Sequence, residues 1–202
     1  MLNQNGQGLL ETIVSLGIIV SGLVGMMNLT IANQSGSEDA SERLVATNLG
    51  REGIEVVRGI RDTNWLSCEI TAGALACNGW DEGLSSGTDT TAVPLFDVAS
   101  NTWSIDFTPD AIMHDYARVW RRSSGTAANI GTQFQSADAT HLDSTLTSYR
   151  RLLDISSICA DKTIAASCAG EKIGMRIQAT VAWASRGKDF SLTIEERLFN
   201  WR

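Results

Sequence analysis

The chain has 202 residues, four cysteines, two prolines and a formal net charge of −7. This length suits one medium domain with a core of its own plus an appended segment. The acidic balance argues against nucleic acid as the main partner, because domains that bind nucleic acid usually present a basic surface.

An apolar run near the N-terminus is the first predicted element. It occupies residues 9–32, and no charged residue lies between Glu11 and Glu38. As an α-helix, this run would extend about 36 Å at about 1.5 Å per residue, enough to cross a hydrocarbon core of about 30 Å. A cleaved secretory signal fits less well, because such signals begin with basic residues and residues 1–6 contain none. We therefore expect a membrane-spanning helix.

Glu11 is the residue that a plain membrane anchor leaves unexplained. A carboxylate in lipid is costly, and where one occurs it usually has a function. The stretch GQGLLE, from Gly6 to Glu11, is similar to the cleavage and methylation site of type IV prepilins and pseudopilins. The resemblance implies cleavage after Gly6, methylation of Gln7 as the new first residue, and a role in assembly for Glu11 as the fifth. The chain departs from the family in having Gln at the first mature position and in lacking the basic leader residue and the kinking proline.

Small residues recur within the apolar run. Gly17, Ser21 and Gly25 lie four residues apart. This spacing would let a second helix approach closely. The alternative is that glycine is simply frequent in membrane helices, and the sequence leaves both interpretations open.

Helical periodicity resumes after a polar interruption at residues 34–39. Apolar residues then recur close to one face, which predicts an amphipathic helix that packs on a globular part. The residues on this face are Leu44, Leu49, Ile54, Val57 and Ile60. The stretch up to Trp65 also resembles the end of the corresponding helix in pilin-like proteins, where the helix leads into a globular head.

Alternation of apolar and polar residues predicts strands in the remainder of the chain. The predicted strands are 102–108, with Trp103, Ile105 and Phe107 on one face; 149–158; 173–183; and, after a turn at 185–188, a last strand from 190. In a regular strand, Phe199 would lie on the face opposite to the earlier apolar residues of the last strand. This predicts a bulge or an end near Glu195 and Glu196. Residues 123–148 form a long polar connection that contains a short strand around Phe134 or is a surface insertion.

The four cysteines form two pairs, Cys68 with Cys77 and Cys159 with Cys168, and each pair would close a short loop of the same size. There is no C-x-x-C motif and the histidines lie far from both pairs, so a zinc site does not fit. We expect two local disulfides in an exported domain. The alternative is four unrelated thiols in a cytosolic protein.

Catalytic and ligand-binding motifs are absent from the sequence. We therefore expect no enzyme activity, no catalytic residue, no metal and no cofactor. Residues 116–122 have two possible interpretations. Tyr116, Arg118, Trp120 and Arg122 occupy every second position and could form one face of a strand, on which nucleic-acid bases stack and phosphates bind. The alternative is that the arginine stems cover aromatic rings on a sheet surface, and the acidic balance of the chain favours it.

These observations predict an α+β protein with a long N-terminal membrane-spanning helix and an antiparallel β-sheet head that is type IV pilin-like and carries two short disulfide loops. The expected divisions are a leader at 1–6, a transmembrane and assembly helix at 7–33, an amphipathic second half at 34–66 and a β-rich head at 67–202.

The family resemblance implies a non-enzymatic minor pilin or pseudopilin of a type IV pilus or a related secretion or competence filament. Its implied partners are other pilin subunits, prepilin peptidase, the cytoplasmic membrane and the pilus assembly platform. The implied location is the cytoplasmic membrane with the head outside, and then the filament at the cell surface. The alternative is an exported ligand-binding domain on an uncleaved membrane anchor.

Overall fold

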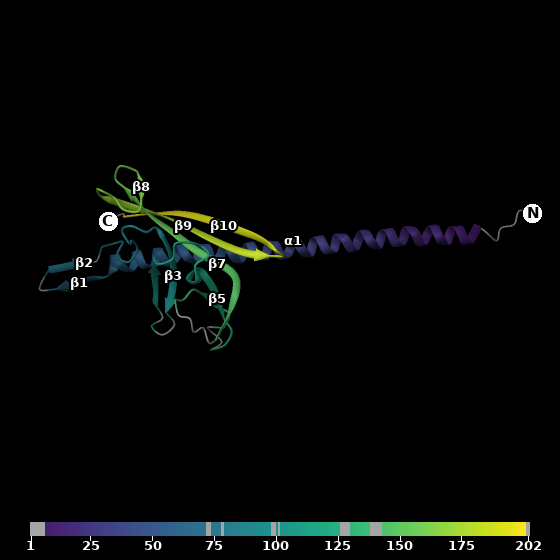
Figure 1. The fold of residues 1–202 in the computed structure, drawn as a ribbon, viewed down its shortest axis with the longest axis horizontal. Coiled ribbons are helices and arrows are strands. Elements are labelled where there is room, and N and C mark those ends of the chain that lie inside the picture. The colour runs from purple at the N-terminus through teal and green to yellow at the C-terminus, as the bar shows by residue number, and fades with distance from the viewer. Residues whose placement is uncertain are drawn as a thin grey trace, which may run out of the picture. The chain divides into compact units, whose positions relative to one another are not determined.

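The computed structural model describes residues 7–71, 74–77, 79–97, 100, 102–125, 130–137 and 143–200, without the side chains of Gln7 and residues 68–78. The chain forms two compact units, residues 1–44 and residues 45–202. Figure 1 shows the order of the helices and strands along the chain.

One helix, α1, extends from Gln7 to Leu66. Both prolines of the chain lie beyond residue 66, so no missing N–H interrupts the helical hydrogen bonds. The polar residues 34–39 do not end the helix, and the Gln34 amide donates to Glu38 at 3.5 Å, one turn later. The structure therefore contains the long N-terminal helix that the hydropathy predicts.

The head, residues 45–202, contains an antiparallel sheet of five strands in the order β10-β9-β7-β3-β4, with three shorter strands beside it. The five strands are β3 (Thr91–Asp97), β4 (Thr102–Asp106), β7 (Ser144–Cys159), β9 (Lys172–Ser185) and β10 (Lys188–Phe199). Four of them coincide with predicted strands, and β3 was not predicted. The α+β class with an antiparallel sheet is confirmed.

The shorter elements fill the predicted connections. They are β1 (Cys68–Thr71), β2 (Ala74–Cys77), the 3₁₀ turn η2 (Asp115–Ala117), β5 (Arg118–Arg122), β6 (Gln133–Phe134) and β8 (Ile164–Ala165). Strand β6 is the short strand that was one of the two alternatives for residues 123–148. It pairs with β5, which pairs in turn with the first part of β7.

The hairpin of β9 and β10 is closed by two residues, Arg186 and Gly187, with φ values of 49° and 73°. Two consecutive positive φ values define the type I′ turn, whose twist matches that of the two strands it joins. The register continues without a shift from the Lys188–Ser185 pair to the Phe199–Gly174 pair. The predicted bulge near Glu195 and Glu196 is therefore wrong.

The apolar residues of β10 that occupy every second position up to Ile194 are followed by a charged residue, Glu196, and this has a different cause. Glu196 occupies a position on the face of β10 that turns towards α1, where an apolar residue was expected, and its carboxylate accepts a hydrogen bond from Arg58 of that helix. The charge at this position is thus paired, and the strand stays regular. Phe199 lies on the outer face and is 45% exposed.

The main core lies between the second half of α1 and the sheet. Its buried residues are Ile54, Val57, Leu84, Ala92, Leu153, Ile155, Met175, Ile177, Ala179 and Leu198. The residues of α1 that face the sheet include Ala46, Leu49, Gly53 and Val57, which repeat at intervals of three and four. Leu44 falls outside this series and is 62% exposed, so its predicted place on the core face is wrong.

Candidate functional site

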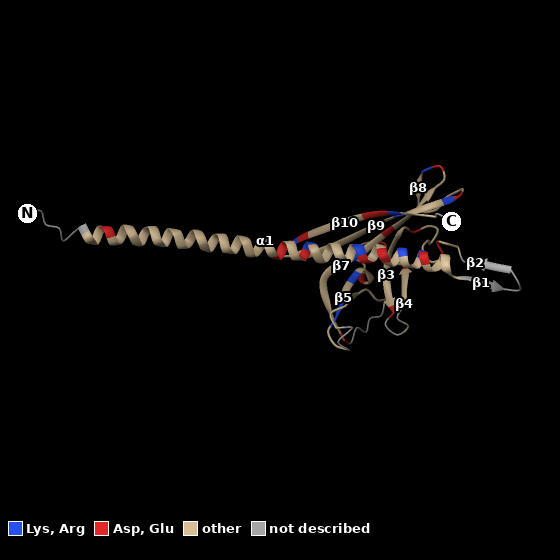
Figure 2. Ribbon diagram, turned by 180° about the vertical axis from the view of Figure 1, so that it is seen from behind, with Lys and Arg blue, Asp and Glu red and all other residues tan. Residues whose placement is uncertain are grey.

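The first half of α1 is apolar on all sides. Its large apolar side chains between Leu9 and Ile31 are each at least half exposed. In Figure 2 this stretch is uncharged except at one acidic position near its start, which the sequence identifies as Glu11. A helix that is apolar all round is normally buried in lipid or among other helices. By length and composition, α1 could cross a membrane.

Two threonine hydroxyl groups of this stretch bond within the helix. Thr12 donates to the carbonyl of Leu9 at 2.9 Å, and Thr30 donates to the carbonyl of Met26 at 2.9 Å. Back-bonding of this kind satisfies these two hydroxyl groups in an apolar environment. Glu11 makes no hydrogen bond or ion pair with the described residues, so its carboxylate is the charged group that needs a partner.

The predicted packing residues present an open surface. A Cβ atom added at Gly17 or Gly25 would meet nothing within 4 Å. Between them, the Ser21 hydroxyl turns back to the Gly17 carbonyl at 2.8 Å. Close approach of a second helix at this surface stays a prediction. Gly6 lies outside the described residues, and Gln7 is described only as the first residue of α1.

A buried arginine fixes the second half of α1 to strand β7. The Arg151 guanidinium is fully buried, and its Nη1 donates to the carbonyl of Leu49 at 2.9 Å and to Glu52 Oε2 at 3.0 Å. Its Nε donates to Gln135 Oε1 at 2.7 Å. Burial lowers the pKa of Arg151, and the Glu52 carboxylate opposes this shift. Alternation predicted the strand but could not indicate which of its two adjacent arginines turns inward.

Gly53 makes room for this arginine. A Cβ atom at Gly53 would lie 3.0 Å from Leu153 Cδ2 and 3.3 Å from Arg151 Cδ. One turn later, Arg58 bonds both Glu55 and Glu196. Burial acts to lower the pKa of Arg58, but the two carboxylates raise it overall. Ion pairs on two sides therefore hold the same helix against β7 and β10.

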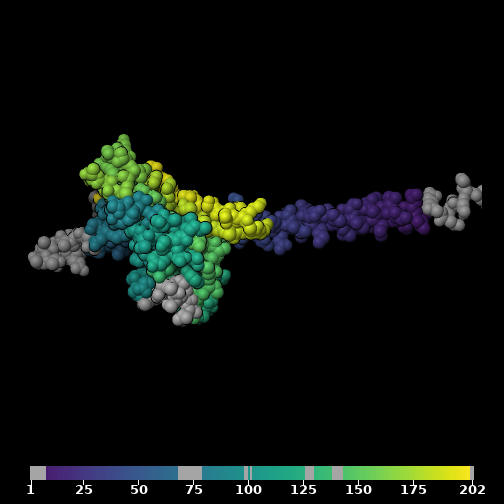
Figure 3. Space-filling model, viewed as in Figure 1, coloured from purple at the N-terminus to yellow at the C-terminus, as the bar shows by residue number. Residues whose placement is uncertain are grey.

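The second pair of cysteines is bridged as predicted. Cys159 and Cys168 form a disulfide with a Cα–Cα distance of 5.6 Å. The loop that it closes projects at the surface of the head around β8 (Figures 1 and 3). Within the loop, the Thr163 hydroxyl and N–H both donate to Asp161, which lowers the pKa of that carboxyl.

The first pair of cysteines remains a prediction. Cys68 and Cys77 are direct Cα partners across the antiparallel pair of β1 and β2. Residues directly opposite in such a pair lie about 4.5–5.5 Å apart at Cα, within the range that a disulfide spans. Their side chains lie outside the described part of the chain.

The candidate nucleic-acid face is not a continuous strand surface. Tyr116 belongs to η2, and the register of β5 shifts between Arg118 and Trp120. Arg118 pairs with Asp115 at 3.1 Å. Arg150, on the neighbouring strand, donates to the carbonyl of Met113 at 3.0 Å. These contacts favour a structural role for the arginines.

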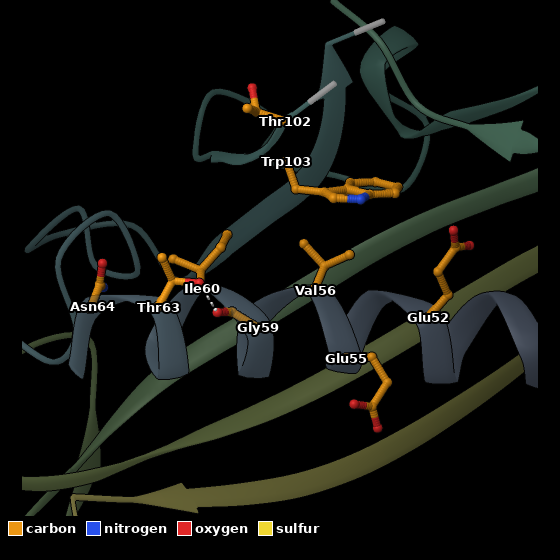
Figure 4. Close-up of a pocket in the computed structure, with 9 residues that line it drawn as sticks. All are labelled: Glu52, Glu55, Val56, Gly59, Ile60, Thr63, Asn64, Thr102 and Trp103. Atoms are coloured by element: carbon orange, nitrogen blue, oxygen red, sulfur yellow. Dashed lines mark hydrogen bonds between the residues drawn. The ribbon is translucent and has the colours of Figure 1, made fainter. Parts of the chain in front are cut away.

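A groove lies between α1 and strand β4, with a volume of about 680 Å³. Its lining residues are Glu52, Glu55, Val56, Gly59, Ile60, Thr63 and Asn64 from α1, and Thr102 and Trp103 from β4. In Figure 4 the Trp103 indole lies over Val56, and the Glu52 side chain stands at the same end of the groove. The groove thus has an apolar floor and an acidic end.

Searches of protein-family models, of curated proteins and of solved structures find no match to this chain. Within the described ranges, no group of three or more His, Cys, Asp or Glu side chains could hold a metal ion. His141 lies outside these ranges.

Proposed function

We propose that this protein is a non-enzymatic subunit, a minor pilin or pseudopilin, of a type IV pilus or a related secretion or competence filament. In this proposal prepilin peptidase cleaves the chain after Gly6, and the mature subunit assembles through the first half of α1. The protein resides first in the cytoplasmic membrane with its head outside. It then joins other pilin subunits on the assembly platform and reaches the cell surface in the filament.

The observation that carries the proposal is the position of Glu11. It is the only charged residue in a helical stretch that is apolar on all sides, and it has no partner among the described residues. A carboxylate at the centre of a membrane helix costs about 2.5–3.5 kcal/mol on insertion scales, and the cost for Glu11, near the start of the stretch, is lower. A partner in the assembled state would offset this cost, whereas a plain anchor would gain nothing from the residue.

Cleavage after Gly6 would supply that partner. It would create an α-amine at Gln7, one helical turn before Glu11. In a filament, the Glu11 carboxylate of one subunit could pair with the Gln7 amine of its neighbour. Pairing would offset the desolvation cost of both groups only when the two helices lie in the correct register. The pair would therefore set the axial step between subunits, while the apolar helices supply the packing.

The N-terminus of the protein from native membranes tests this proposal. Mass spectrometry of the N-terminal peptide should find Gln7 as the first residue, with an N-methyl group. A Gln7 cyclised to pyroglutamate would also show cleavage after Gly6, but it would lack the amine that the pair with Glu11 requires. A Gly6→Val variant is the matched control, because a bulky residue before the bond should block cleavage and leave Met1 in place. Retention of Met1 in the unchanged protein would overturn the proposal.

The groove between α1 and β4 favours a second candidate function. An exported ligand-binding domain on an uncleaved anchor would also have an apolar helix and a surface groove. The two candidates differ in processing, since an anchor keeps its first residues. The same mass measurement therefore separates them.

A further inference from the structure

Within the described part of the chain, no strand pairs with the outer side of the edge strand β4, next to the groove. It is the last strand in the order of the sheet and pairs with β3. On the other side of β3, the Phe96 N–H donates to the carbonyl of Gln135 at 3.0 Å, so the backbone of Phe96 faces away from β4. Phe96 lies opposite Trp103. In an antiparallel pair, bonded and non-bonded positions alternate, so Phe96 and Trp103 form a non-bonded pair.

The backbone of Trp103 therefore points to the open edge. Ile105, two residues later, has the same orientation, and the residue opposite it is Pro94, which has no N–H to donate. The backbone hydrogen bonds of the described loops and turns include none to Trp103 or Ile105. The edge of β4 thus offers two N–H groups and two carbonyls at the spacing of a sheet ladder.

The two edges of the sheet differ in their protection. Proteins usually protect an edge strand from pairing with other chains by charged residues, proline or bulges. Strand β10, at the opposite edge, carries charged side chains at Lys188, Asp189, Glu195, Glu196 and Arg197. Strand β4 has the sequence Thr-Trp-Ser-Ile-Asp, with no proline and with one charged residue, Asp106, at its end. The less protected edge is the one that borders the groove.

The groove has room for an added strand and one acidic side chain that faces it. Gly59 is exposed on its α1 wall, and a Cβ atom there would meet nothing within 4 Å. The lining residues include Glu52 and Glu55 and no Lys or Arg. Glu55 pairs with Arg58 and points away from Trp103 in Figure 4, and Glu52 Oε2 pairs with the buried Arg151. The Glu52 carboxylate is therefore the acidic group that faces the groove. The side chains of Glu52 and Glu55 are 37% and 60% exposed.

We propose that this groove binds an extended, basic segment of a partner protein as an added strand beside β4. The segment pairs with the backbone of Trp103 and Ile105, as in other cases of strand addition to a sheet edge. An apolar side chain of the segment rests on Val56 and Trp103, and a Lys or Arg side chain reaches Glu52. This interaction does not depend on cleavage after Gly6 or on filament assembly.

A second copy of the chain is a poorer occupant. Antiparallel pairing of two β4 edges about a two-fold axis would place both α1 helices on the same side of the joined sheet. The Glu52 carboxylates of the two copies would then lie in one shared groove, where like charges repel. A basic partner strand meets the Glu52 carboxylate with opposite charge.

The test uses the full chain in detergent micelles and a synthetic peptide, acetyl-Lys-Thr-Val-Thr-Ile-Thr-Lys-amide, at about 1 mM, the weak end of specific binding. Hydrogen exchange is measured at single-residue resolution. We expect the amides of Trp103 and Ile105 to exchange at least about tenfold more slowly with the peptide. The Ser104 amide should change little, because it already pairs with β3.

Matched variants and peptides identify the mode of binding. Gly59→Arg places a long side chain in the groove and should abolish the protection, whereas Gly36→Arg, at another open glycine of α1, should leave it intact. A peptide with alternate N-methylated amides should lose binding, because it cannot complete the ladder. A peptide with Glu in place of both Lys should bind at least about tenfold more weakly.

Three results would overturn the proposal. The first is no protection of Trp103 and Ile105 in the unchanged protein. The second is equal binding by the N-methylated or acidic peptide, or by the Gly59→Arg variant. The third is protection of the same two amides that rises with protein concentration in the absence of peptide, which would assign the groove to a second copy of the chain.

Discussion

Arg151 Nη1 lies 3.0 Å from Glu52 Oε2, and this contact joins a fully buried guanidinium of β7 to a partly exposed carboxylate of α1. The two residues are separated by 99 positions in the sequence. A buried guanidinium without a carboxylate partner is strongly unfavourable, because it has lost its hydration. The pair therefore specifies how the second half of α1 lies on the sheet.

Removal of either partner should destabilise the head. We expect Glu52→Ala to lower the free energy of unfolding by about 2–4 kcal/mol, below the full cost for a buried pair because Glu52 is partly exposed. Arg151→Met should also destabilise, since it leaves Gln135 without its donor. The double variant should be less destabilised than the sum of the two by about 1–3 kcal/mol. Urea unfolding of all four proteins measures this coupling.

Glu55→Ala is the control for this cycle. Glu55 lies on the same helix and also pairs with an arginine, but its side chain is 60% exposed. Its loss should cost less than about 1 kcal/mol. Strict additivity of Glu52→Ala and Arg151→Met would show that the buried contact contributes nothing to stability.

The head should fold without the apolar part of the helix. We expect a chain that begins at about residue 34 to be soluble, folded and monomeric, because both buried clusters of the head consist of residues from position 45 onwards. Circular dichroism and sedimentation measure fold and association. Aggregation of this shortened chain with its disulfides formed would contradict the prediction, because it would mean that the removed segment covers part of the core.

Much of the fold follows from local patterns in the sequence. The helix is predictable because hydropathy at residues 9–32 and amphipathic periodicity after the polar residues 34–39 both indicate a helix, and its 60 residues contain no proline. The hairpin of β9 and β10 is predictable because strict alternation flanks a two-residue turn that contains Gly187. Strand β3 was missed because Pro94 normally argues against a strand, although it is tolerated here where its nitrogen faces no partner on β4.

The misjudged positions depend on contacts between distant residues. The inward position of Glu196 looks like a break in β10 until Arg58 is seen beside it. Arg150 and Arg151 are adjacent in a sequence that alternates weakly, and only the Leu49 carbonyl and Glu52 show which one turns inward. The open edge of β4 requires knowledge of the strand order. None of these relationships is encoded in the spacing of residues along one segment.

The disulfide between Cys159 and Cys168 should stabilise the head. Closing a loop of this size in the unfolded chain corresponds to about 2–3 kcal/mol by loop-closure entropy. Cys159→Ser with Cys168→Ser should lower the free energy of unfolding by this amount and leave the secondary structure unchanged. Peptide mapping without reduction should show this bridge and, as a second local bridge, Cys68 with Cys77. Crossed connectivity would refute the second assignment.

Asp161 should titrate below the ordinary range of aspartate. Its carboxylate accepts hydrogen bonds from the hydroxyl and the N–H of Thr163, which favour the charged form and lower its pKa. A group with a lower pKa in the folded state contributes stability above its unfolded pKa, near 3.9, and this contribution disappears as the pH falls through the folded pKa. NMR titration should show a higher pKa for Asp161 in Thr163→Val and no change in Thr163→Ser. An unchanged pKa in Thr163→Val would show that the hydroxyl has no part in the shift.

Glu11→Ala should prevent assembly and leave the head intact. The substitution removes a charge from the apolar stretch, so membrane insertion should be unchanged or improved. The variant should be expressed, cleaved and disulfide-bonded like the unchanged protein, because Glu11 makes no hydrogen bond or ion pair with the described residues. It should nevertheless be absent from sheared filaments, since the Gln7 amine of the neighbouring subunit would have no carboxylate to pair with.

The measurement is co-purification of tagged wild type and Glu11→Ala with filaments from cells that carry the other filament subunits. Glu11→Asp is the matched variant. It keeps the charge on a side chain shorter by one methylene, and it should enter filaments at a level between those of the other two proteins, because the pair then forms with poorer geometry. Incorporation of the alanine variant at the level of wild type would show that Glu11 does not determine assembly. Loss of the alanine variant from the membrane itself would show that Glu11 acts before assembly, in insertion or folding.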